Sequence, residues 1–141
     1  MQIELGLRGD YGIRAVLDVA RHHRRGRRKT REIAQAMDIP PKYLSHILAA
    51  LVHAGVLFAT AGPAGGYQLV QPPGKTRLLD VINAVDDSSE IHRCVLKGIP
   101  CSSGDSCAIH HHWFAAQNAM RSELRRTTFA HLLRSESAPV R

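Results

Sequence analysis

The sequence predicts a mainly α-helical protein with a small β-hairpin, arranged as a winged helix-turn-helix that is followed by a long dimerisation helix. Two short amphipathic patterns flank a proline turn near residue 40, a glycine-rich hairpin pattern follows them, and a narrow apolar stripe occupies residues 108–126. We expect a DNA-binding domain over residues 1–75, a region for dimerisation and cofactor binding over 76–134, and a disordered tail over 135–141.

The first helix is predicted over residues 9–23, because apolar residues recur there on one helical face. They are Ile13, Val16, Leu17 and Ala20. Asp10 stands at the start of this helix, where a carboxylate favours the helix dipole. The segment from His22 to Arg31 is rich in arginine and lysine. On charge alone it would be a solvated loop, but the motif that follows favours contact with DNA phosphates.

Residues 31–37 and 41–53 form the predicted helix-turn-helix. Thr30 suits the N-cap of the first of these helices, Pro41 suits the first position of the second, and Gly55 ends it. The second helix has an apolar back and a free face of side chains that can donate hydrogen bonds to phosphates and base edges. We expect this helix to enter the major groove.

A β-hairpin is predicted over residues 56–70, with a glycine-rich turn at its tip. A hairpin directly after a helix-turn-helix is a wing, and its glycines allow close approach to a minor groove. No Lys-Ser/Thr signature follows, so a nucleotide-binding phosphate loop is not indicated. The residues expected to contact DNA are Arg27, Arg28, Lys29 and Arg31 in the basic segment, Lys42, Tyr43, Ser45 and His46 on the second helix, and Gly62 and Gly65 in the wing.

Two further helices are predicted, over residues 78–86 and 108–126, and residues 129–133 are expected to pack back onto the domain. The longer helix carries a stripe at roughly 3.5-residue spacing, which is typical of a helix that packs along a partner helix. Its members are Ile109, Trp113, Ala116, Met120 and Leu124. Because so short a chain leaves little to cover this stripe, we expect a homodimer.

All three cysteines, Cys94, Cys101 and Cys107, lie in one segment rich in turn-forming residues, and His110 follows the last of them. An odd number of cysteines argues against a closed disulfide framework. Three sulfurs in one short loop are what a thiolate-ligated metal needs. We therefore predict a metal-binding segment that leads directly into the long helix.

The net charge of +7 is concentrated in the first half of the chain, which fits a domain that meets a polyanion. No apolar run is long enough for a transmembrane helix, and the N-terminus lacks the layout of a secretory signal. We expect a cytoplasmic protein without a membrane partner. No catalytic constellation is evident, so we do not expect an enzyme.

This order of parts resembles the family of winged-helix iron–sulfur transcriptional regulators that includes IscR and NsrR. The matching stretches are Asp10–Leu17, Ile39–Leu44, Gly62–Tyr67, Asp80–Asp86 and the cysteine segment through His110. The resemblance implies a dimer on a near-palindromic operator in double-stranded DNA, with one iron–sulfur cluster per subunit that responds to nitric oxide, redox state or the supply of iron or clusters. The sequence departs from the pattern of this family in three places: the gap between the first two cysteines is longer, residue 61 in the wing is Ala61, and residue 45 on the recognition helix is Ser45.

The resemblance implies that Cys94, Cys101 and Cys107 are iron ligands. It leaves two candidates for the fourth ligand. His110 corresponds to members with a 2Fe–2S cluster, whereas Asp10, supplied by the other subunit, corresponds to members with a 4Fe–4S cluster. We favour His110 because it is local, and we expect His111 and His112 to be simply exposed.

Three alternatives remain. Zinc would fit the same three cysteines and a histidine. A metal-free thiol switch would use oxidation of the cysteines. An enzyme or electron carrier that uses the cluster is disfavoured, because the first half of the chain is given to DNA binding.

Overall fold

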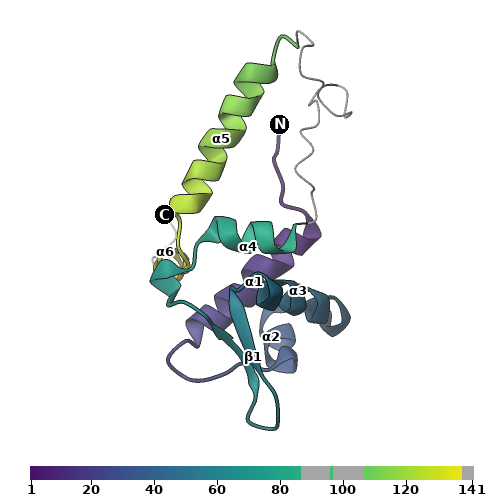
Figure 1. The fold of residues 1–141 in the computed structure, drawn as a ribbon, viewed down its shortest axis with the longest axis vertical. Helices are drawn as coiled ribbons and strands as arrows, with labels where there is room; N and C mark the ends of the chain where they lie inside the picture. Colours follow the sequence, from purple (N-terminus) through teal and green to yellow (C-terminus); the bar gives the residue numbers. More distant parts are fainter. Residues whose placement is uncertain (87–95, 97–106, 138–141) are drawn as a thin grey trace.

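Nine elements make up the fold in the computed structural model, which describes residues 1–86, 96 and 107–137. In chain order they are α1 (Leu7–Arg21), α2 (Thr30–Met37), α3 (Pro41–His53), β1 (Leu57–Thr60), β2 (Gly66–Leu69), the 3₁₀ helix η1 (Pro73–Lys75), α4 (Leu78–Val85), α5 (His110–Arg126) and α6 (Phe129–Ser137). The predicted winged helix-turn-helix and the long helix after it are confirmed (Figure 1).

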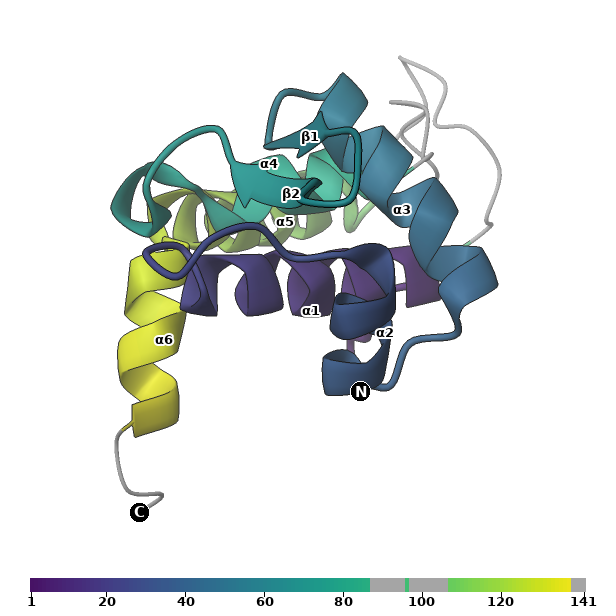
Figure 2. The same ribbon diagram turned by 90° about the horizontal axis from the view of Figure 1, so that it is seen from below.

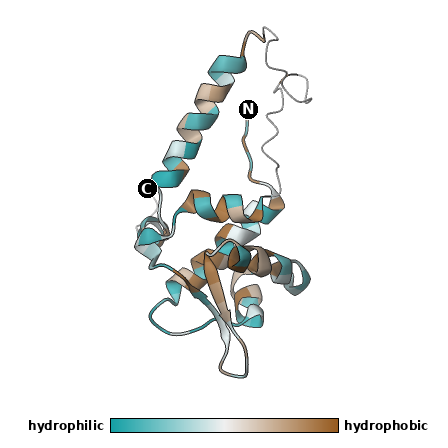
Figure 3. Ribbon diagram, viewed as in Figure 1, coloured by the Kyte–Doolittle hydropathy of each residue, from teal (hydrophilic) through white to brown (hydrophobic). Residues whose placement is uncertain are grey.

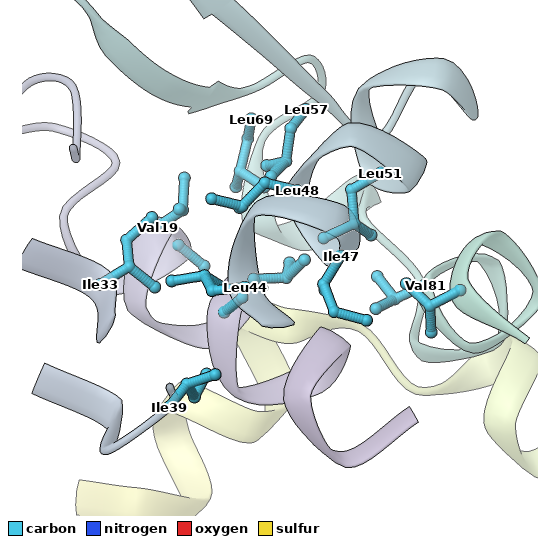
Figure 4. Packing of buried hydrophobic residues seen from close by; sticks show 14 of the residues in the cluster. Val19, Ile33, Ile39, Leu44, Ile47, Leu48, Leu51, Leu57, Leu69 and Val81 are labelled. Atoms are coloured by element: carbon cyan, nitrogen blue, oxygen red, sulfur yellow. The ribbon is translucent and has the colours of Figure 1, made fainter. Parts of the chain in front are cut away.

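The core forms where α1, α2, α3, α4 and the hairpin meet. Helix α3 contributes one completely buried face to it, because apolar residues recur there every three or four positions. The buried residues of α3 are Leu44, Ile47, Leu48 and Leu51. They pack among Val19, Ile33, Leu57 and Val81 from the surrounding elements (Figure 4). The opposite face of α3 is therefore left on the surface.

Strands β1 and β2 pair antiparallel, with Leu57 opposite Leu69 and Thr60 opposite Gly66. Leu57 and Leu69 are both buried, so the base of the wing is anchored in the core. Viewed from below, α3 and α6 lie towards opposite ends of α1, with the hairpin across the space between them (Figure 2). Phe129, at the start of α6, is completely buried, which confirms that this segment packs back onto the domain.

The boundaries that differ from the sequence predictions include the starts of α1 and α2 and the end of α6. Asp10 lies inside the first turn of α1, and its backbone N–H already donates to the carbonyl of Gly6. Lys29, not Thr30, is the N-cap of α2, because Glu32 accepts a hydrogen bond from the Lys29 backbone N–H at 2.9 Å. Helix α6 continues to Ser137, so the expected disordered tail is wrong for residues 135–137, and residues 138–141 lie outside the described residues.

Helix α5 stands apart from the core. It extends away from the winged-helix body, and none of its residues is buried (Figure 1). Strongly hydrophobic residues concentrate in the body, whereas α5 alternates between hydrophilic and weakly hydrophobic residues (Figure 3). Among the described residues, no helix is both long and apolar enough to cross a membrane.

Candidate DNA-binding surface and cluster-binding segment

The outer face of α3 is exposed as predicted. Lys42, Tyr43, Ser45 and His46 all lie on it, opposite the buried leucines. The hydroxyl of Ser45 donates to the carbonyl of Pro41 at 3.1 Å, which leaves its oxygen lone pairs towards solvent. This face therefore combines a positive charge, hydroxyl groups and an imidazole on a helix that can fit a major groove.

Helix α1 supports the N-terminal end of this surface. The rings of Tyr11 and Tyr43 lie 6.4 Å apart between their centroids, and the guanidinium of Arg14 lies 5.2 Å from the centroid of the Tyr11 ring. A cation at this distance from an aromatic face is attracted by the ring. The first turn of α3 is thus positioned by side chains of α1.

Arg28, predicted to contact DNA, is instead directed into the protein. Its guanidinium donates to both carboxylate oxygens of Asp18, at 2.9 and 3.3 Å, and to Glu32 at 3.1 Å. The Asp18 side chain is completely buried. The hydrogen bond to Asp18 raises the pKa of Arg28 above its ordinary value, so the guanidinium stays charged.

The Arg28 backbone also joins the basic segment to the wing. Its N–H donates to the carbonyl of Tyr67 at 3.0 Å, and its carbonyl accepts from the Tyr67 N–H at 2.8 Å. The sequence analysis missed this link. It brings the exposed Arg27 beside the wing, where its guanidinium donates to the carbonyl of Ala64 at 3.4 Å. Lys29 and Arg31 are also exposed, so three of the four predicted basic residues remain accessible to a phosphate backbone.

The two wing glycines have different surroundings. Gly62 is exposed at the tip and has a φ of 96°, a conformation that favours glycine. Gly65 is buried, and a Cβ added to it would lie 2.0 Å from the carbonyl oxygen of Thr60. Gly65 therefore shapes the turn from within, and Gly62 is the one of the pair that a DNA backbone can approach.

The predicted cluster-binding segment lies largely outside the described residues, and Cys94 and Cys101 are among those not described. Cys107 is a half-buried free thiol, and its carbonyl accepts a hydrogen bond from the His110 backbone N–H at 3.2 Å. The His110 ring is half-buried and stacks on Phe114 with centroids 6.2 Å apart. Cys107 and His110 are thus one turn apart at the start of α5, whereas His111 and His112 are exposed as expected.

Asp10, the other candidate for the fourth ligand, is engaged within its own chain. Its two carboxylate oxygens accept hydrogen bonds from Arg14 at 2.9 and 2.8 Å. The described residues alone place no three His, Cys, Asp or Glu side chains where they could hold a metal ion. The donor set of three thiols with a histidine or a carboxylate nevertheless has the chemistry of an iron–sulfur or zinc site.

Comparisons with known proteins agree with this architecture. The model of the Rrf2 family, described as iron-dependent transcriptional regulators, matches residues 5–135. The HTH-type transcriptional regulator IscR of Cronobacter sakazakii is 31% identical over 134 residues, which span 95% of this chain and 82% of the relative.

Solved structures show the same fold. IscR of T. potens superposes with a TM-score of 0.81 at 23% identity, covering 100% of this chain and 95% of that one. CymR of B. subtilis, a global cysteine regulator, superposes with a TM-score of 0.77 at 22% identity, covering 93% and 96% of the two chains.

Proposed function

The chain belongs to the Rrf2 family of transcriptional regulators, and on that premise we propose that it binds near-palindromic operator DNA as a homodimer and holds an iron–sulfur cluster whose condition controls the binding. The observation that carries the proposal is the position of Cys107 and His110 at the start of α5, a helix without a buried residue. One segment would thus serve both the cluster and the dimer. Its site of action would be the cytoplasm, where the operator is.

The proposed ligands are Cys94, Cys101, Cys107 and His110. His110 is preferred to Asp10, because Arg14 already occupies both carboxylate oxygens of Asp10. This preference favours a 2Fe–2S over a 4Fe–4S cluster. A bound cluster would supply an iron that lacks full thiolate ligation and is therefore open to nitric oxide, to oxygen or to iron loss.

Helix α5 supplies a route from the cluster-binding segment to the DNA-binding domain. It contacts α4, and the backbone N–H of Leu78 in α4 donates to the carbonyl of Thr127 just beyond α5 at 2.9 Å. Helix α4 in turn packs against α1 and α3. A change at the start of α5 would therefore alter how the two recognition helices of a dimer are spaced, and operator half-sites demand a fixed spacing.

The test is purification without oxygen, followed by iron and sulfide assays, a visible spectrum and operator binding before and after chelation. We expect brown protein whose operator affinity changes on chelation. Cys101→Ala and His110→Ala should lose or alter the spectrum, whereas the matched variant His112→Ala should keep it. An Asp10→Asn variant that alters the spectrum while His110→Ala does not would reassign the fourth ligand. Colourless protein with an unchanged affinity would refute the proposal.

A thiol switch is the second candidate function. It is favoured by the free thiol of Cys107 and by the structural likeness to CymR, a cysteine regulator. Titration of free thiols before and after peroxide, on the protein as purified and with its metal content measured, distinguishes the two. Loss of two thiols per chain together with a change in operator affinity would support this switch. Bound zinc would instead give a colourless protein with one metal per chain and no thiol loss.

A further inference from the structure

A cleft lined mainly by basic side chains lies at the base of α5, and no residue of α3 takes part in it. Its volume is about 650 Å³. The lining residues are Gln71, Gly74, Lys75, Arg77, Arg125, Arg126 and Thr128. Most of them are cationic and none is acidic. A concave surface that concentrates one sign of charge attracts ions of the other sign.

The fold brings these cations together from two segments that are far apart in the sequence. Arg77 and Thr128 form an antiparallel bridge, and the backbone N–H of Phe129 donates to the carbonyl of Thr76 at 3.0 Å. Thr76 is buried, and its hydroxyl shares its one hydrogen between the backbone carbonyls of Gln71 and Pro72, at 3.2 and 3.1 Å. The cationic side chains therefore stand on a backbone that is held in place on both sides.

Favourable interactions within the fold account for only two of the four cations that line the cleft. Arg125 and Arg126 end α5, where cations favour the helix dipole, and Arg126 pairs with Glu123. The dipole does not explain why Lys75 and Arg77 lie opposite them. Within the described residues, no ion pair joins Lys75, Arg77 or Arg125 to a carboxylate. Like charges gathered without partners repel one another, and an anion would relieve that repulsion.

A second hollow of about 330 Å³ adjoins the cleft, because Gln71 and Lys75 line both. It presents side chains of a different kind, among them Asp80 and Asn83. A carboxylate and an amide can hydrogen-bond hydroxyl and amino groups. The pair of hollows therefore offers cations at one end and a carboxylate and an amide for hydrogen bonding at the other, over a volume typical of small-molecule sites.

We propose that this cleft binds a free compound carrying a pyrophosphate group, of the nucleoside di- or triphosphate class, with its phosphates among Lys75, Arg77, Arg125 and Arg126. Guanidinium groups match phosphate oxygens in a two-pronged geometry, which suits three arginines that surround one cleft. Such a ligand would join the segment after β2 to the end of α5. It would therefore tighten the junction between the long helix and the winged-helix body.

The experiment is calorimetric titration of sodium pyrophosphate into full-length protein without DNA, with sodium sulfate at matched ionic strength as the comparison. We expect one pyrophosphate per chain, binding at least tenfold more tightly than sulfate, and a higher unfolding temperature when it is bound. The variant Lys75→Gln/Arg125→Gln should weaken this binding at least tenfold. The matched variant Arg121→Gln/Arg134→Gln removes the same charge from exposed positions outside the cleft and should change the affinity less than twofold.

Three results would overturn the proposal. Equal weakening in both double variants would show a general charge effect, and pyrophosphate that binds no better than sulfate would show that the cleft has no preference for it. The third result would show that the cleft binds DNA and not a free ligand. In that case neither wild type nor the Lys75→Gln/Arg125→Gln variant would bind pyrophosphate, and the variant would lose affinity only for operator DNA with long flanking sequences. The titration needs neither DNA nor the cluster, so its outcome is independent of the proposed regulatory function.

Discussion

Asp10 and Arg14 form a two-pronged ion pair one turn apart on α1, with contacts of 2.9 and 2.8 Å between nitrogen and oxygen. The remaining Nη1 of Arg14 donates to the carbonyl of Met37 at 2.7 Å, at the end of α2. Asp10 raises the pKa of Arg14 by its hydrogen bond, so the guanidinium stays charged. The carboxylate that is the second candidate for the fourth cluster ligand is thus connected, through one arginine, to the turn of the helix-turn-helix.

Arg14→Gln should therefore destabilise the protein and weaken operator binding. The ion pair is partly exposed, so it contributes little by itself, and the bond to a helix-terminal carbonyl adds to it. We expect a loss of about 1 kcal/mol in the free energy of unfolding, measured in urea. Arg21→Gln is the control, because Arg21 makes an exposed pair with Glu136 outside this turn. A loss for Arg21→Gln as large as that for Arg14→Gln would show that the bond to Met37 has no particular weight.

Arg28 and Asp18 should show strong energetic coupling. Replacing Arg28 by methionine leaves a completely buried carboxylate without its cation, a change that typically costs about 3–5 kcal/mol. The double variant Asp18→Leu/Arg28→Met removes both charges, and we expect it to be more stable than Arg28→Met alone. Urea unfolding of the single and double variants measures the coupling.

The exposed neighbour Arg31 supplies the control for this cycle. Arg31→Met should change the free energy of unfolding by less than about 0.5 kcal/mol. If Arg28→Met changes the free energy of unfolding as little as Arg31→Met does, then the ion pair does not anchor the basic segment. Arg28 would in that case again be a candidate for contact with DNA.

Glu32 should make stability depend on pH in the acidic range. Its carboxylate accepts the backbone N–H of Lys29, which lowers its pKa below the ordinary value, and Arg28 lowers it further. A lowered folded-state pKa means that the stabilisation is fully present above the unfolded value of about 4.3 and is lost as the pH falls through the folded value. The glutamine of a Glu32→Gln variant carries no charge at any of these pH values. The difference in free energy of unfolding between wild type and this variant should therefore shrink on acidification from pH 6 to pH 3. A difference that is constant over this range would contradict the assignment.

The sequence predicted the helices well because their apolar residues recur at helical spacing, as Leu44 and Leu48 do in α3. The fate of Arg28 could not be read from a run of basic residues, because only the fold selects which cation meets Asp18. One signal was available: Asp18 lies three residues after the buried Ala15, on the face that enters the core. The basic cleft left no such local signal, because Arg77 and Arg125 meet only through the bridge beside Thr128.

Met120 should lie in the interface of the proposed homodimer. It is 43% exposed in the single chain, although it belongs to the apolar stripe of α5. A helix of this length is marginally stable without a partner surface, so a second copy of α5 is the natural cover. Met120→Glu would place a charge in that contact, and we expect the dimer to dissociate at least tenfold more readily in sedimentation experiments, with weaker operator binding as a consequence.

Asn118→Glu is the matched control for the same helix. Position 118 is about 160° from position 120 around a helix of 3.6 residues per turn, so the same charge would project away from the stripe. This variant should sediment as wild type does. Dissociation by both variants would mean that added negative charge on α5 acts wherever it is placed, and dissociation by neither would mean that the stripe does not form the interface. Only loss of the dimer in Met120→Glu alone assigns the contact to the stripe that includes Trp113 and Leu124.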